Sequence, residues 1–203
     1  MEKSRLKEIM LDQKESFNRR SALTERDIDL RKAISTKQIV IVSGIRRCGK
    51  STLLYFIKEK MKLKESEYCY FNFDDERIVA DVSIFEDLYN LHLELYGIEP
   101  VLFLDEIQNI LHWERFVNRM YERGNKIFIS GSNANLQLSD VSASLTGRNK
   151  QIEMFPFSFV EYLTFMGHTY DLSGMTTKAR SLLNLDFNHF LSMGGFPLVL
   201  KED

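Results

Sequence analysis

The feature that most constrains this chain is the run Gly-Ile-Arg-Arg-Cys-Gly-Lys-Ser at residues 44–51. It matches the phosphate-binding pattern G-x-x-x-x-G-K-[ST] at every position. Gly44 and Gly49 permit backbone angles that side chains forbid, so successive N–H groups can surround a β-phosphate at a helix start. Lys50 would reach the β- and γ-phosphates, and the Ser51 hydroxyl would coordinate Mg²⁺. We assign the nucleotide contacts to Gly44, Ile45, Arg46, Arg47, Cys48, Gly49, Lys50, Ser51 and Thr52.

The sequence on either side of this loop predicts the fold class. A run of four apolar residues, 39–42, indicates a strand buried on both faces, as in a parallel sheet. Strands and helices then alternate, which predicts crossover connections in an α/β fold with a five-stranded parallel sheet. The expected strands are 38–43, 68–73, 101–104, 126–130 and 150–154, and the expected helices between them are 50–62, 84–96, 113–123 and 135–145.

A pair of carboxylates follows the third predicted strand, at Asp105 and Glu106. Downstream of a phosphate-binding loop, an aspartate at such a strand end is expected to hold Mg²⁺, and the next glutamate to orient the attacking water. The turn after the strand should aim the two side chains differently. Because strand 68–73 precedes this strand along the chain, we expect a strand inserted in space between the loop strand and the Asp105 strand.

Three more polar residues are candidates for the chemistry. Ser132 or Asn133, at the end of the fourth strand, would sense the γ-phosphate or hold the water, although Gly-Ser-Asn is also good turn chemistry. Arg148 precedes the fifth strand. It would stabilise the charge that develops during phosphoryl transfer, in trans if subunits associate, or it is a surface arginine favoured by a helix C-terminus.

Other residues near the loop have two readings each. One of Arg46 and Arg47 contacts phosphate or a partner, or both are solvent-exposed. Cys48 is most simply a small residue that fits the turn, and the alternative is a redox role. The acidic turn 74–76 is a solvated turn or lies at the nucleotide edge of the sheet. The phenylalanines at 155, 157, 159 and 165 are expected to pack between the sheet and the helices, and the alternative is a base-stacking platform.

Composition argues against several classes of protein. The 29 acidic and 27 basic residues nearly cancel, so no global positive field argues for nucleic-acid binding, and only a local positive patch stays open for it. No apolar run approaches the roughly 20 residues that span a bilayer. The two cysteines, Cys48 and Cys69, are interpreted as free thiols in a reducing compartment. We therefore expect a cytoplasmic protein without a membrane partner.

The chain is expected to have three parts. Residues 1–37 form a helical lead-in with a weak apolar face, residues 38–155 form the sheet domain, and residues 156–203 begin a helical lid with helices near 157–165 and 177–193.

Taken in order, the motifs resemble those of the prokaryotic AAA-domain ATPases of the "type 14" kind. The resemblance covers about residues 38–200 and includes Phe-Leu-Asp-Glu-Ile-Gln, Trp-Glu-Arg-Phe, Ile-Ser-Gly-Ser-Asn, Leu-Thr-Gly-Arg, Phe-Pro-Phe-Ser-Phe and Gly-Gly-Phe-Pro. It implies a P-loop sheet of the AAA-like strand order, ATP with Mg²⁺ as ligands, and hydrolysis. It places Pro197 in a helical-domain turn near the adenine.

The same resemblance implies a C-terminal effector domain, often nuclease-like. Because the sequence ends at Asp203, we expect a truncated or shortened member. Three functions remain open: an ATP-hydrolysing switch or motor that self-associates or acts on a protein partner, a nucleotide-gated binding module with negligible turnover, and a DNA-associated ATPase.

Overall fold

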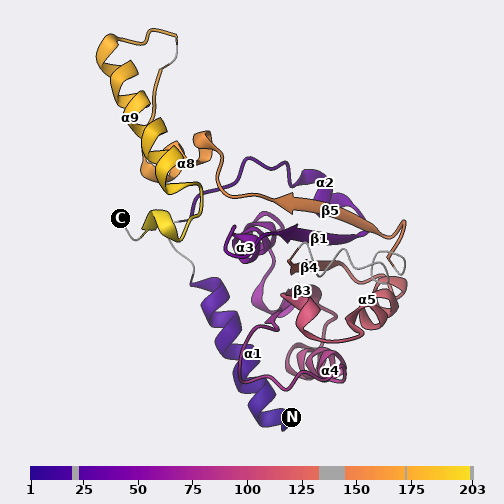
Figure 1. Cartoon of the computed structure of the whole chain (residues 1–203). Helices are drawn as coiled ribbons and strands as arrows, with labels where there is room; N and C mark the ends of the chain where they lie inside the picture. Colours follow the sequence, from indigo (N-terminus) through magenta and orange to yellow (C-terminus); the bar gives the residue numbers. More distant parts are fainter. Residues whose placement is uncertain (20–22, 133–144, 172, 202–203) are drawn as a thin grey trace.

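The computed structural model describes residues 1–19, 23–132, 145–171 and 173–201. Its five strands form one parallel sheet in the order β2-β3-β4-β1-β5 (Figure 1). The strands are β1 (Ile39–Gly44), β2 (Tyr68–Asn72), β3 (Val101–Asp105), β4 (Ile127–Gly131) and β5 (Asn149–Met154). The predicted parallel sheet is confirmed. The inserted strand is also confirmed, because β4 lies between the loop strand β1 and the Asp105 strand β3.

From residue 50 on, the helices agree with the sequence prediction to within a few residues at their ends, whereas the lead-in contains two separate helices. They are α1 (Lys3–Asn18), α2 (Arg31–Ser35), α3 (Lys50–Lys60), α4 (Ile84–Tyr96), α5 (Trp113–Glu122), α8 (Phe159–Met166) and α9 (Thr177–Met193), with short 3₁₀ turns η1 (Glu65–Glu67), η2 (Ile107–Asn109) and η3 (Val199–Lys201). The helix expected at 135–145 falls almost wholly outside the described residues.

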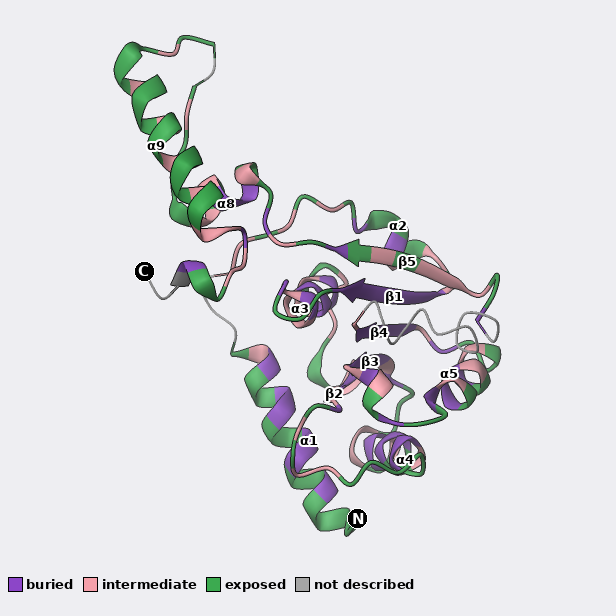
Figure 2. Ribbon diagram, viewed as in Figure 1, coloured by how far each residue is buried: buried purple, intermediate pink, exposed green. Residues whose placement is uncertain are grey.

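The sheet is buried on both faces, as the apolar run in β1 predicts. Alternate side chains of a strand point to opposite faces. Val40 and Val42 pack with α3 in one core, whereas Ile39 and Ile41 belong to a second core with α4 and α5. The result is a three-layer arrangement with helices on either side of the sheet (Figure 2).

Helix α1 packs along the β2 edge and joins both cores. Its Leu6, Ile9 and Met10 belong to the core on the α4 side, and Phe17 belongs to the core on the α3 side. The Phe17 ring stacks on Tyr70 of β2 with 3.8 Å between centroids. The lead-in therefore contributes to the sheet domain, and the boundary expected at residue 38 falls between segments that pack together.

The C-terminal helices α8 and α9 form a hairpin with a small core of its own around Phe157 and Tyr162. Helix α8 begins at a capping box, in which Ser158 and Glu161 each accept a hydrogen bond from the other's backbone N–H. Helix α9 has no buried residue and is mostly exposed in Figure 2. In the described parts of the chain, no helix is both long enough and apolar enough to cross a membrane.

Candidate functional site

The predicted phosphate-binding loop connects β1 to α3 with glycine where only glycine fits. Gly44 has φ of 155°, and a Cβ there would lie 2.4 Å from the carbonyl oxygen of Met154 on β5. Gly49, with φ of 100°, occupies the left-handed region immediately before Lys50 begins α3. The close approach of β5 and the start of the helix thus account for the two glycines of the motif.

Lys50 lies under the loop and is almost completely buried, with 3% of its side chain exposed. Its Nζ donates to the carbonyl oxygens of Gly44, at 3.3 Å, and Ile45, at 3.2 Å. The same Nζ lies 3.3 Å from Oε1 of Glu106. The structure therefore brings together Lys50 and Glu106, two residues that the sequence predicted for one site. Ser51 and Thr52 are half-buried in the first turn of α3.

Asp105 is fully buried at the end of β3, and two hydroxyls hold its carboxylate. Tyr70 Oη donates to Oδ2 at 2.9 Å, and Ser130 Oγ donates to Oδ1. Sequence reasoning missed both supporting residues. The register explains the position of Ser130, because Leu104 pairs with Ile129, which sets Ser130 beside Asp105. The sequence held one signal for Ser130, which is that this polar residue follows the apolar run of β4.

Glu106 points elsewhere because its backbone turns sharply after the strand. It adopts φ of 51° and ψ of 43°, in the left-handed region. Its N–H donates to Ser130 Oγ at 3.2 Å, and its Oε2 accepts from Gln108 Nε2 at 2.7 Å. The side chain keeps 20% exposure. The two adjacent carboxylates are thus separated into a buried one and a partly accessible one.

The remaining predicted residues lie in different places. Ser132 follows Gly131, which pairs with Ser43 at the end of β1, so Ser132 lies near the start of the loop. Asn133 lies outside the described residues. Arg148 precedes β5, at the end of the strand opposite the loop, where it donates to Asn118 at 3.1 Å and pairs with Glu122 at 3.1 Å. About six residues of strand, or roughly 20 Å, separate it from Gly44.

The acidic turn after β2 contacts the phosphate-binding loop. Arg46 pairs with Asp74 at 2.8 Å, and Asn109 donates to the other oxygen of Asp74 at 3.2 Å. This turn therefore lies at the loop edge of the sheet while also being solvent-exposed, so both readings of it hold in part. Arg47 is exposed with φ of 67°. Cys48 is buried against the loop, and burial raises the pKa of its thiol, as suits a packing residue.

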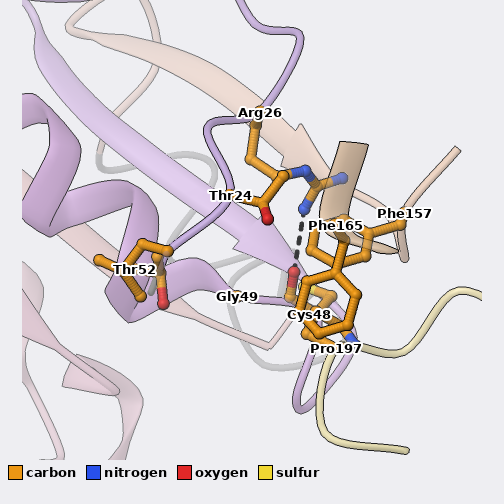
Figure 3. Close-up of a pocket in the computed structure, with 9 residues that line it drawn as sticks. Thr24, Arg26, Cys48, Gly49, Thr52, Phe157, Phe165 and Pro197 are labelled. Carbon is orange, nitrogen blue, oxygen red and sulfur yellow. Dashed lines mark hydrogen bonds between the residues drawn. The ribbon is translucent and has the colours of Figure 1, made fainter. Parts of the chain in front are cut away.

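A pocket flanks the loop on the side of the C-terminal helices (Figure 3). Its core-side wall includes Cys48, Gly49 and Thr52, and the opposite wall is apolar, with Phe157, Phe165 and Pro197. The Phe157 N–H donates to Gly195 O at 2.7 Å, which fixes the Gly-Gly-Phe-Pro turn against this wall. Two of the four phenylalanines expected to pack thus line a pocket, and Phe155 is 62% exposed.

The pocket also takes residues from the segment that precedes β1, which sequence reasoning missed. Leu23, Thr24 and Arg26 line it, and Arg26 Nη1 donates to Cys48 O at 3.0 Å, drawn as a dashed line in Figure 3. No motif marks these residues in the sequence.

The oxygens at this edge suit Mg²⁺. Ser51 offers a hydroxyl and Asp105 a carboxylate, both hard oxygen donors of the kind that Mg²⁺ takes while keeping several waters. Each carboxylate oxygen has two lone pairs, so Asp105 can still accept a metal-bound water beside its hydroxyl partner. Among the described residues, no group of three or more His, Cys, Asp or Glu side chains forms a separate metal site.

Comparison with known proteins agrees with this geometry. A family model described as an AAA domain matches residues 36–163. An uncharacterized protein of Methanocaldococcus jannaschii is 32% identical over 198 residues, covering 97% of this chain and 43% of that protein. An uncharacterized protein of Haemophilus influenzae is 29% identical over 191 residues, covering 90% of this chain and 46% of that protein. The chain thus spans less than half the length of these relatives.

Among solved structures, the AMPPCP-bound DnaA of Aquifex aeolicus superposes with a TM-score of 0.47 and 16% identity. The match covers 83% of this chain and 59% of that one.

Proposed function

Because the chain belongs to the AAA domain family, we propose that it binds ATP together with Mg²⁺ and hydrolyses it to ADP and phosphate. The observation that carries the proposal is the meeting of Lys50 and Glu106 beneath the phosphate-binding loop, with 3.3 Å between Nζ and Oε1. A cation from the start of α3 and a carboxylate from the turn after β3 converge where the γ-phosphate of a bound nucleotide would lie.

The loop supplies most of the binding. Its N–H groups and the start of α3 form a positive concave surface for the phosphates. Lys50 now donates to the carbonyl oxygens of Gly44 and Ile45, and it would exchange these for phosphate oxygens. That exchange removes the positive partner of Glu106, which leaves the carboxylate free to accept a proton from water.

The carboxylates divide the remaining work. Ser51 and Asp105 would hold Mg²⁺, which neutralises charge on the phosphates. Tyr70 and Ser130 hold the Asp105 carboxylate in its orientation by donating to its two oxygens. Glu106, partly accessible, orients the attacking water in line with the leaving group. The apolar wall of the pocket offers a surface for the base of the nucleotide next to the same loop, and it consists of Phe157, Phe165 and Pro197.

The pocket joins the loop to the C-terminal helices, so nucleotide occupancy would change how α8 and α9 lie. We propose that the domain acts as a switch or motor in this way, with self-association or a protein partner receiving the movement.

Calorimetric titration of ATP, with and without Mg²⁺, tests the binding step. Lys50→Ala should abolish measurable binding, and Asp105→Asn should bind ATP with a loss of the Mg²⁺ effect. Lys60→Ala, on the exposed end of the same helix, is the matched control and should bind as the wild type does. Equal affinities for the wild type and Lys50→Ala would refute the assignment of the loop.

A further inference from the structure

One buried ion pair connects the C-terminal helices to the loop side of the sheet domain. Arg26 and Glu161 are separated by most of the chain, yet Arg26 Nε lies 2.7 Å from Glu161 Oε1 and Nη2 lies 3.2 Å from Oε2. Only 7% of the Arg26 side chain and 9% of the Glu161 side chain are exposed. The contact is therefore a two-point pair shielded from water.

The Glu161 carboxylate is saturated with donors. Besides Arg26, it accepts from the backbone N–H of Asp27 at 3.0 Å and of Ser158 at 2.8 Å. Ser158 is the residue that caps α8, so Glu161 both closes the capping box and ties the first turn of α8 to the segment before β1.

Arg26 uses its other N–H groups to reach two further segments. It donates to Cys48 O inside the phosphate-binding loop at 3.0 Å and to Phe155 O after β5 at 2.9 Å. Its guanidinium lies 5.1 Å from the centroid of the Phe157 ring, within cation–π distance. A single side chain thus joins the loop, the β5–α8 connection and the aromatic wall of the pocket.

The burial of the pair decides what its loss would do. Exposed ion pairs contribute little, but removing one member of a buried pair leaves an uncompensated charge and is strongly unfavourable. The change that stabilises such a charge at the lowest free-energy cost is a movement of α8 away from it, so that water can hydrate the charge. The wall formed by Phe157 and Phe165 moves with α8, whereas the phosphate side of the site, Lys50 and Ser51, belongs to α3.

We propose that Arg26 and Glu161 are positioning residues for nucleotide binding: they fasten α8 and the aromatic wall of the pocket onto the phosphate-binding loop, and so set the affinity for the base. The inference rests on the ATP binding proposed above. It separates the site into a phosphate part that does not need Glu161 and a base part that does.

Two ligands distinguish these parts. Mg²⁺-ATP carries a base, and inorganic tripolyphosphate with Mg²⁺ carries only the phosphates. Glu161→Gln removes the charge while keeping the shape, and Arg26→Lys keeps the charge while losing the planar fork that reaches several acceptors. We expect each variant to weaken Mg²⁺-ATP binding about tenfold or more, the scale of one lost buried interaction. Glu161→Gln should bind tripolyphosphate with wild-type affinity.

Controls separate this effect from misfolding. Asp29→Asn removes a carboxylate from the same segment in an exposed pair with Arg31, and it should leave both affinities unchanged. Because the two residues act as one unit, the loss of binding free energy in the double variant should be smaller than the sum of the losses in the two single variants. If Glu161→Gln does not fold, Arg26→Lys provides the same comparison for Mg²⁺-ATP.

Three results would overturn the proposal. Wild-type ATP affinity in both variants, with binding still lost in Lys50→Ala, would remove the positioning role and leave the proposed function intact. An equal loss of ATP and tripolyphosphate affinity in Glu161→Gln would show that the pair acts through the whole fold. Failure of the wild type to bind ATP would sink the proposed function and this inference together.

Discussion

Replacing Tyr70 by Phe tests how the buried carboxylate of Asp105, the proposed Mg²⁺ ligand, is held. The change removes one hydroxyl, which donates to Asp105 Oδ2 at 2.9 Å, and leaves the ring stacked on Phe17. Asp105 has no solvent exposure, so no bulk water replaces the lost donor. The variant therefore removes a hydrogen bond to a buried carboxylate.

The magnitude follows from that geometry. A hydrogen bond to a charged group contributes about 1.5–3 kcal/mol. In a chain of this size, each kcal/mol lowers the melting temperature by about 2–4 °C, so we expect Tyr70→Phe to melt about 3–12 °C below the wild type. Thermal unfolding followed by circular dichroism measures the melting temperature. ATP turnover at increasing Mg²⁺ concentration measures the effect on the Mg²⁺ requirement. We expect half-maximal turnover to require more Mg²⁺, because Asp105 is less firmly oriented.

Tyr68→Phe is the matched control. Tyr68 lies on the same strand, is equally buried, and donates to the neutral Asn18 at 2.7 Å, away from Asp105. Its loss should cost about 0.5–1.5 kcal/mol and leave the Mg²⁺ requirement unchanged. A Tyr70→Phe variant with wild-type melting and wild-type Mg²⁺ dependence would refute the supporting role of the hydroxyl, and so would an equal shift of the Mg²⁺ requirement in both variants.

Three further changes have expected outcomes. Gly44→Ala places a Cβ 2.4 Å from a carbonyl oxygen and should lower the free energy of unfolding by about 1–3 kcal/mol in urea titrations. A urea midpoint equal to that of the wild type would contradict this prediction. Arg148→Ala should abolish any rise of ATP turnover per subunit with protein concentration, whereas a rise that persists excludes action in trans. Burial lowers the pKa of His92 from 6.5 to about 4. Between pH 6.5 and pH 4, only the unfolded chain therefore takes up a proton at His92. Stability should fall by roughly 3 kcal/mol from pH 6.5 to 4, and His92→Gln should flatten that slope in denaturant titrations; an unchanged slope would contradict the assignment.

The parts of the site that could be predicted are motifs whose residues are adjacent in the sequence. The loop 44–51 and the pair Asp105–Glu106 each combine residue type with a strand end, so their approximate positions follow from the parallel sheet alone. The side chains that hold them come from elsewhere. Tyr70 and Ser130 reach Asp105 only through the strand register, and that register is decided by packing over long sequence distances.

Helix α1 shows a second reason for incomplete prediction. Its apolar stripe looks weak because two of its buried positions are polar, Gln13 and Lys14. The structure satisfies them with distant partners: Gln13 donates to Asn72 O at 3.1 Å, and Lys14 to Tyr68 O at 3.3 Å. No local pattern shows that such partners exist. Similarly, Arg26 carries no motif, although the spacing of Ser158 and Glu161 is the signature of a helix start.

The measurement that tests the central claim most directly is phosphate release from Mg²⁺-ATP by the wild type beside Glu106→Gln, at several protein concentrations. The side chain of Gln keeps the size of Glu but cannot accept the proton of the attacking water. We predict that the wild type releases phosphate, while Glu106→Gln binds ATP and releases phosphate at least about a hundredfold more slowly. Tight ATP binding by the wild type with no phosphate at any concentration would contradict the account and favour a nucleotide-gated binding module.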